Sequence, residues 1–324
     1  CICKILPSLR ARRSAIKLVI HLENHSSEAM DCKYKVEVSG ICSANLYGNC
    51  NRDCCRFTHI KSGRIFDSHC HLDIMKEKGL NMERLPLPPR FGGCFANFCH
   101  PWRWDQIAGL LAPKNCWGSV GIHPKSADQF DLDVFQQMKE IIVSNVKVIA
   151  VGEAGLDKSW HSHASNPCQG YVFAKQCELA CHLNLPLIVH CRNADEECLA
   201  LMKHHLPIDH PVHLHCFTGG LVLAEKYLAH FQKLHIGVTG LVTLIGDRRS
   251  NNVADVAKNI PLNRLLLETD APYHVPHPSQ AKYCHPGMVL HTAQEVARLR
   301  NISVVRVLDA NALGVRQVYN VQLL

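Results

Sequence analysis

The chain has 324 residues, of which 47% are hydrophobic, and a formal net charge of +7. This length accommodates one α/β barrel of about 250 residues together with a small additional module. It contains no run of about 18 uncharged apolar residues, so the sequence predicts no membrane-spanning helix. Because the chain begins with Cys1 rather than Met, we expect it to be a fragment of a longer protein.

The positive charge is concentrated near the N-terminus. Residues 1–66 carry 11 Lys and Arg against 5 Asp and Glu, which leaves 24 against 23 for residues 67–324. A basic segment of this kind suits contact with a polyanion or an acidic surface, and it equally fits a solvated tail. Residues 1–40 have little other pattern and predict either a short helix or a disordered arm.

Cysteine is abundant, with 18 residues, of which seven lie in residues 1–55. Many of the others, such as Cys177 and Cys181, stand in apolar runs where cysteine acts as a small hydrophobic residue. The spacing does not resemble a compact secreted disulfide scaffold. We therefore expect a reducing compartment, the nucleus or the cytoplasm.

Residues 41–62 form a second predicted unit. Four side chains follow the spacing C-x7-C-x4-C-x3-H, namely Cys42, Cys50, Cys55 and His59. Thiolates with one imidazole suit a tetrahedral zinc ion, which can fold a segment too short for its own core. The segment resembles a CCCH zinc finger of the RNA-binding kind, in which Tyr47 and Phe57 would stack on bases. The alternative is a cysteine-rich loop without metal.

From residue 63 to residue 324 the pattern alternates between strands and helices. The predicted strands are 64–68, 93–98, 117–122, 148–152, 185–189, 212–214, 234–238 and 264–269. The predicted helices include 131–142, with Asp131 as its N-cap, 172–183, 285–300 and 303–319, whereas 76–92 reads as an irregular loop. Eight strands alternating with helices predict a parallel α/β sheet closed into a TIM (β/α)8 barrel.

Five of these strands run into side chains that can bind a metal. His69 and His71 end the first strand, and residues two apart in a strand point the same way. An isolated His-x-His equally fits a buried strand end with two hydrogen-bonded histidines. The later strands deliver Glu153, His190, His215 and Asp270 in the same position. A metal centre at the C-terminal end of the barrel explains this recurrence.

Six motifs in this region carry a family resemblance. They are Ser-His-Cys-His-Leu-Asp at 68–73, Gly-Ile-His-Pro at 121–124, Gly-Glu-Ala-Gly-Leu-Asp at 152–157, His-Cys-Arg at 190–192, His-Cys-Phe-Thr-Gly at 215–219 and Glu-Thr-Asp-Ala-Pro-Tyr at 268–273. Together they resemble the TatD family of metal-dependent deoxyribonucleases over about residues 64–320. The resemblance implies one divalent ion on His69, His71 and Asp270, with Glu153 bridging to a second ion on His190 and His215.

The chemistry of this set agrees with that implication. Two metal ions can stabilise both the attacking and the leaving oxygen at a phosphodiester, and Asp270 is our candidate general base. Histidine and carboxylate ligands suit Zn, Mn or Mg, with Zn or Mn favoured over Mg alone.

Three residues in or near these motifs are candidate contacts to the substrate. Arg192 either binds the phosphate or pairs with Asp195 or Glu196. His123 either contacts a phosphate or water or is structural, and Lys125 stands where the family often has His. Asp157 and Tyr273 are expected to support the site. A second departure from the family lies at 158–163, where Trp160 could stack on a base.

Three functions fit these patterns. The first is a nuclease that cuts DNA, with RNA or RNA–DNA hybrids as further substrates. The second is an amidohydrolase for a small molecule, although such barrels commonly use a carboxylated Lys where this chain has Glu153. The third is a nucleic-acid-binding adaptor with an inert barrel. Exonuclease or endonuclease action, the preference for DNA or RNA, and the oligomeric state stay open at this point.

Overall fold

The computed structural model describes residues 64–159, 166–246 and 248–321. The basic N-terminal segment, the predicted zinc finger with its four ligands, and Trp160 lie outside the described residues.

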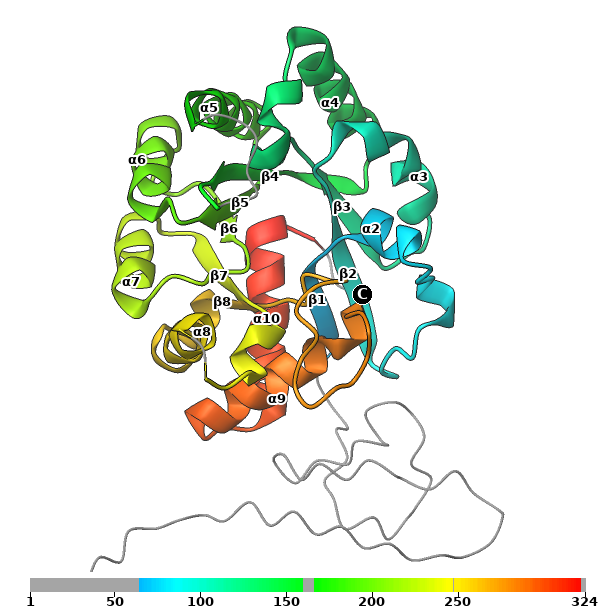
Figure 1. The fold of residues 1–324 in the computed structure, drawn as a ribbon, viewed down its shortest axis with the longest axis vertical. Helices are drawn as coiled ribbons and strands as arrows, with labels where there is room; N and C mark the ends of the chain where they lie inside the picture. The colour runs from blue at the N-terminus through cyan, green and yellow to red at the C-terminus, as the bar shows by residue number, and fades with distance from the viewer. Residues whose placement is uncertain (1–63, 160–165, 247, 322–324) are drawn as a thin grey trace, which may run out of the picture. The chain divides into compact units, whose positions relative to one another are not determined.

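Eight parallel strands follow one another around a barrel in the order β1 to β8 (Figure 1). They are β1 (Ile65–Cys70), β2 (Phe91–Phe98), β3 (Cys116–Val120), β4 (Val148–Asp157), β5 (Leu187–Arg192), β6 (Val212–Leu214), β7 (Leu234–Val238) and β8 (Leu265–Leu267). Two backbone hydrogen bonds join the chain after β8 to β1, from Asp270 N to His69 O at 2.9 Å and from His71 N to Ala271 O at 2.7 Å. The predicted TIM barrel is confirmed.

Helices follow the strands along the chain, and most of them surround the barrel. They are α2 (Leu72–Glu77), α3 (Ile107–Leu110), α4 (Leu132–Ser144), α5 (Asn166–Leu183), α6 (Asp195–His205), α7 (Leu221–His230), α8 (Arg248–Asn259), α9 (Val289–Arg300) and α10 (Val304–Tyr319). The predicted N-cap is present, because the Asp131 carboxylate accepts a hydrogen bond from Val134 N at 2.7 Å. The predicted loop 76–92 is largely irregular, apart from the end of α2, a short 3-10 turn at Met82–Arg84 and the start of β2.

The strand β4 extends five residues beyond its predicted end at Gly152. Its register against β5 shifts between Val151 and Ala154 and then continues to the pair Asp157 and Arg192. The shift is a bulge, which re-aims a side chain without ending the strand. Gly155 permits the close approach that follows, because a Cβ there would lie 1.9 Å from the His190 carbonyl oxygen. Glu153 therefore lies within a strand rather than at its end.

The C-terminal helix α10 closes the end of the barrel at which the strands begin, and it is seen through the ring of strands in Figure 1. Its apolar side chains pack into the barrel interior against residues from five strands, forming the cluster Phe66, Phe95, Ala150, Ile188, Leu266, Val315, Val318 and Tyr319. Asn311 fastens the helix to the barrel, since it accepts from Leu267 N at 2.8 Å and donates to Phe66 O at 2.9 Å. The opposite, C-terminal end of the strands is left for the functional side chains.

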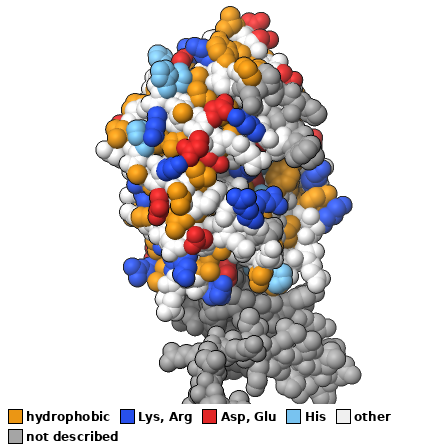
Figure 2. Space-filling model, turned by 60° about the vertical axis from the view of Figure 1, so that its left-hand side comes forward, with side chains coloured by type: hydrophobic (Ala, Val, Ile, Leu, Met, Phe, Trp, Pro, Cys, Tyr) orange, Lys and Arg blue, Asp and Glu red, His pale blue; other side chains and the backbone are white. Residues whose placement is uncertain are grey.

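No helix in the described ranges is long and apolar enough to cross a membrane. On the face drawn in Figure 2, Lys and Arg side chains are interspersed with Asp, Glu and hydrophobic ones. Free thiols in the described part of the chain include those of Cys70, Cys94, Cys99, Cys116, Cys177, Cys181, Cys191, Cys198, Cys216 and Cys284. Most of them are buried and act as packing residues, as the sequence predicts.

Candidate metal centre

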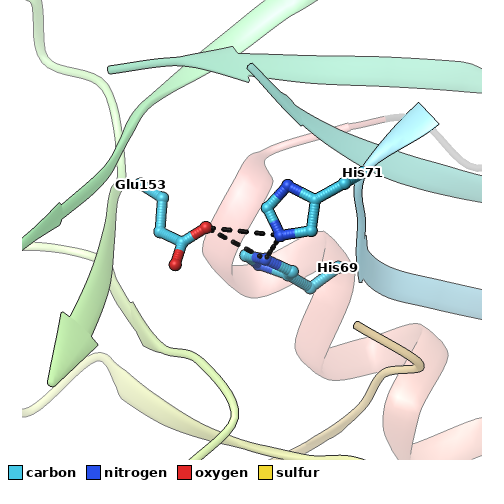
Figure 3. A group of neighbouring side chains, drawn as sticks. All are labelled: His69, His71 and Glu153. Carbon is cyan, nitrogen blue, oxygen red and sulfur yellow. Dashed lines mark hydrogen bonds and ion pairs between the residues drawn. The ribbon is translucent and has the colours of Figure 1, made fainter. Parts of the chain in front are cut away.

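Two histidines from the end of β1 face a carboxylate from β4 across the barrel (Figure 3). The Nε2 atoms of His69 and His71 lie 3.4 Å apart, and each is 3.5 Å from Oε2 of Glu153. All three side chains are buried. Their donor atoms lie within 4.8 Å of one another, which is the convergence that a single ion requires.

Asp270 completes this group from the chain that follows β8. Its Oδ1 atom lies 3.2 Å from Nε2 of His71 and 3.7 Å from Nε2 of His69. The structure thus brings together the three side chains that the family resemblance implies for one ion, although 201 positions separate the first histidine from the aspartate.

The second carboxylate oxygen of Glu153 faces another pair of histidines. Its Oε1 atom lies 2.8 Å from Nδ1 of His190 and 2.8 Å from Nε2 of His215. These two ring nitrogens are 3.2 Å apart. One carboxylate therefore lies between two histidine pairs, with one oxygen directed at each.

Hydrogen bonds on the outer side of the rings show that this donor set fits metal ions. His190 has its Nε2 atom 3.2 Å from Oδ2 of Asp157, and His71 has its Nδ1 atom 3.3 Å from the Asn97 carbonyl oxygen. With an ion bound, each ring would be neutral and donate outward, which leaves its inward nitrogen unprotonated, as in metal-binding histidines. Each inward nitrogen lies close to a carboxylate oxygen, so an ion could take both as ligands.

The electrostatics of the carboxylates agree with this fit. Burial acts to raise the pKa of Glu153, but His215 and His190 outweigh it and hold that pKa well below its ordinary value. Burial likewise acts to raise the pKa of Asp270, and His274 and His71 hold it well below its ordinary value. Both carboxylates are ionised at neutral pH and available to a cation.

The predicted substrate contacts lie around this centre. His123 has its Nε2 atom 3.6 Å from Oε1 of Glu153, and its Nδ1 atom accepts from Lys125 N at 3.0 Å. The Lys125 ammonium lies 3.4 Å from Oδ2 of Asp157 and is partly exposed. Lys125 therefore contacts the carboxylate that supports His190, a contact that the sequence does not reveal.

Arg192 lies on β5, two residues beyond His190. Burial acts to lower the pKa of its guanidinium, but negative groups that include Asp270 and Glu153 raise that pKa. Within the described ranges it forms no ion pair with Asp195 or Glu196, the alternative that the sequence left open. Its Nη1 atom donates to the Cys191 carbonyl oxygen at 2.8 Å, and its charge lies near enough to the two carboxylates of the centre to interact with them.

Three further polar groups adjoin the centre, and the motifs alone did not single them out. His274 has its Nε2 atom 3.3 Å from Oδ2 of Asp270 and 3.5 Å from Sγ of Cys216. Below them in the barrel, burial raises the pKa of Glu268 to about 8, and Oε2 of this residue lies 2.9 Å from Nε2 of His213. Cys216 and Glu268 both belong to the motifs of the family resemblance. In those motifs, only the adjacent histidine and the nearby aspartate were identified as candidate ligands.

The structure is a parallel eight-stranded barrel, and its buried histidines and carboxylates converge at the C-terminal ends of the strands. These features define a metal-dependent hydrolase of the TIM-barrel type. The sequence profile described as "TatD related DNase" matches residues 66–320. The chain belongs to this family.

Named relatives fall within the same family. The chain is 34% identical over 255 residues to the human protein "3'-5' RNA nuclease TATDN2", an alignment that covers 73% of this chain and 32% of the human one. It thus spans about a third of the length of that relative. It is also 34% identical over 213 residues to "3'-5' ssDNA/RNA exonuclease TatD" of Erwinia tasmaniensis, covering 64% of this chain and 80% of the bacterial one. The likeness to TATDN2 agrees with the family resemblance of the motifs.

Solved structures support the fold. The crystal structure of YJJV, a TatD homologue from Escherichia coli, superposes with a TM-score of 0.69 at 24% sequence identity. The superposition covers 80% of this chain and 99% of the bacterial chain. A TatD family hydrolase from Entamoeba histolytica superposes with a TM-score of 0.67 at 18% identity, covering 80% of this chain and 98% of that one.

Proposed function

We propose that this protein is a metal-dependent nuclease that hydrolyses phosphodiester bonds in single-stranded DNA and RNA, acting from the 3′ end. The observation that carries the proposal is the placement of Glu153, with one oxygen facing His69 and His71 and the other facing His190 and His215. The substrate class and the direction come from the names of the human and Erwinia relatives.

In this proposal two divalent ions occupy the centre. His69, His71 and Asp270 would hold the first, His190 and His215 the second, and Glu153 would bridge them. The histidine content favours Zn or Mn over Mg alone. When bound, the ions supply Lewis acidity toward the phosphodiester and lower the pKa of water.

The residues of the chain then have separate tasks. Asp270 is ionised and takes the proton of the attacking water at a carboxylate oxygen. Arg192 faces the same region and balances the charge that develops on the phosphate. His123 accepts a backbone hydrogen bond at Nδ1, so its neutral ring carries the proton at Nε2 and can donate to a phosphate oxygen. Asp157 orients His190.

Two exposed aromatic side chains near the centre favour a single-stranded substrate. Trp102 is 56% exposed and stacks on His100, whose ring is 5.7 Å from that of His123. Tyr273 is 47% exposed, and its ring is 6.1 Å from that of His71. Exposed aromatic rings stack on unpaired bases with little dependence on sequence.

We further propose that Cys42, Cys50, Cys55 and His59 hold one zinc ion in a finger that binds nucleic acid, preceded by the basic segment 1–40. Their spacing supports this proposal. We place the protein in the nucleus or cytoplasm, which accords with its free thiols.

The test is cleavage by metal-stripped protein with Mn, Mg or Zn added back. The substrates are 5′-labelled single-stranded DNA, single-stranded RNA, an RNA–DNA hybrid and duplex DNA. Metal-dependent shortening from the 3′ end of the single strands supports the proposal. Failure to cleave all four substrates under every metal condition would refute it.

A further inference from the structure

We propose a third cation site beside the centre, formed by Cys216 Sγ, Asp270 Oδ2 and His274 Nε2, that binds zinc-like ions and inhibits the enzyme. The existence of this site does not depend on the proposed nuclease activity, whereas its inhibitory role rests on that function. A thiolate, an imidazole and a carboxylate form a set that zinc accepts in tetrahedral sites, with water as the fourth ligand.

The geometry brings three donor atoms of different kinds to one point. His274 Nε2 lies 3.5 Å from Cys216 Sγ and 3.3 Å from Asp270 Oδ2, and the three donor atoms all lie within 4.8 Å of one another. Cys216 and Asp270 are buried, whereas the His274 side chain is 24% exposed. The cluster is thus closed on the barrel side and reachable by an ion from solvent on the His274 side.

The backbone of the same three residues is unusual. Cys216, Asp270 and His274 have φ angles of 43°, 54° and 50°, in the left-handed region. Among the described residues, the other non-glycine positions with positive φ are all asparagines. Asn, Asp and His adopt this region more readily than other side chains, so Cys216 is the member of the cluster at which a positive φ is least expected. Backbone strain of this kind concentrates at ligand-binding sites, where the surrounding structure holds it in place.

Asp270 links this cluster to the principal centre. Its Oδ1 atom faces His71, whereas its Oδ2 atom faces His274. Asp270 would therefore lie between the third site and the first ion, just as Glu153 lies between the two histidine pairs. A cation at Cys216 and His274 would hold Oδ2 and remove it as a proton acceptor. Excess zinc is therefore expected to inhibit, whereas excess Mg, a poor partner for thiolate, is not.

A simple ion pair between His274 and Asp270 is the competing explanation. It accounts for the 3.3 Å contact between those two side chains, and Cys216 would then only share a hydrogen bond with the same nitrogen of His274. The two explanations differ in a measurable way, because an ion pair binds no metal and leaves the thiol unchanged when metal is added.

Cobalt(II) titration of the metal-stripped full chain tests the site, with bound metal counted by mass spectrometry and thiolate coordination followed by the cobalt charge-transfer absorption. The variants are Cys216→Ser and His274→Gln, and Cys198→Ser on α6 is the matched control for removing a buried thiol. We expect the wild type and the control to bind one more cobalt ion than either test variant, with a stronger thiolate absorption. Cysteines of the predicted finger contribute equally to all four proteins.

Equal metal counts and equal thiolate absorption in the wild type and in folded His274→Gln would overturn the proposal. This variant changes a partly exposed side chain, so it remains informative if Cys216→Ser fails to fold, which circular dichroism would show. In activity assays, His274→Gln should raise the zinc concentration needed for inhibition by about tenfold or more. An unchanged inhibition midpoint would overturn the inhibitory role. A protein that shows the cobalt signal but cleaves no nucleic acid would retain the site and refute the nuclease.

Discussion

Replacing Asp157 by Asn should weaken one of the two proposed metal sites and leave the other nearly unchanged. Asp157 Oδ2 lies 3.2 Å from Nε2 of His190, whose other ring nitrogen faces Glu153 at 2.8 Å. The carboxylate therefore fixes the tautomer and the orientation of a proposed ligand from outside. It is buried, and its Oδ1 atom is held by Ser159 N at 2.8 Å, so the isosteric amide keeps the packing while removing the charge.

The expected loss follows from the role of such outer partners. Their removal weakens metal binding by about 10- to 100-fold, which corresponds to about 1.4–2.7 kcal/mol. The assay is competition between the metal-stripped protein and a fluorescent chelator, which resolves the two ions by affinity. Asp309→Asn on the exposed face of α10 is the matched control. If the affinity for both ions were unchanged, or fell equally at both, the assignment of His190 to the second ion alone would be refuted.

Three further predictions concern other parts of the molecule. Asn311→Ala leaves two buried backbone groups of the barrel without partners, so the free energy of unfolding should fall by about 2–5 kcal/mol, measured by chemical denaturation. Trp102→Ala and Tyr273→Ala should each raise KM for single strands about 5- to 150-fold with a smaller change in kcat, because each removes about 1–3 kcal/mol of base stacking. Cys50→Ser should weaken nucleic-acid binding in gel-shift titrations while barrel metal content stays unchanged.

Each of these predictions has a control and an opposing result. Asn259→Ala on α8 removes an exposed amide, and a loss of stability as large as that of Asn311→Ala would contradict the role of α10. Tyr171→Ala removes an aromatic ring that is 53% exposed on α5, and it should leave KM unchanged. Equal KM effects at all three aromatic positions would argue against a binding surface at the centre. If Cys50→Ser bound nucleic acid as tightly as the wild type, residues 41–62 would have only a structural role.

The strands were the most predictable part of the fold. The ranges 212–214 and 234–238 match β6 and β7 residue for residue, because a short, mainly apolar run between polar turns is typical of a strand that is buried on both faces. β4 was predicted too short. Gly152 and Glu153 look like the end of a strand, whereas the register shift there lets the polar side chain enter the barrel while pairing with β5 continues.

The candidate centre was predictable because its side chains stand at or near the ends of parallel strands, which meet at one end of a barrel. The cluster of Cys216 and His274 was not, since 58 positions separate these residues and their meeting depends on the loop after β8. The contact between Lys125 and Asp157 likewise depends on how two strand ends converge. The attachment of α10 through Asn311 depends on helix packing that periodicity alone does not define.

The most direct test of the account is the comparison of the wild type with Glu153→Gln, using Glu225→Gln on the exposed face of α7 as the matched control. The measurement combines the number of bound metal ions with metal-dependent cleavage of single-stranded DNA and RNA. We expect Glu153→Gln to lose bound metal and cleavage together, whereas the control retains both. Metal-dependent cleavage at the wild-type rate in Glu153→Gln would contradict a centre built around this carboxylate.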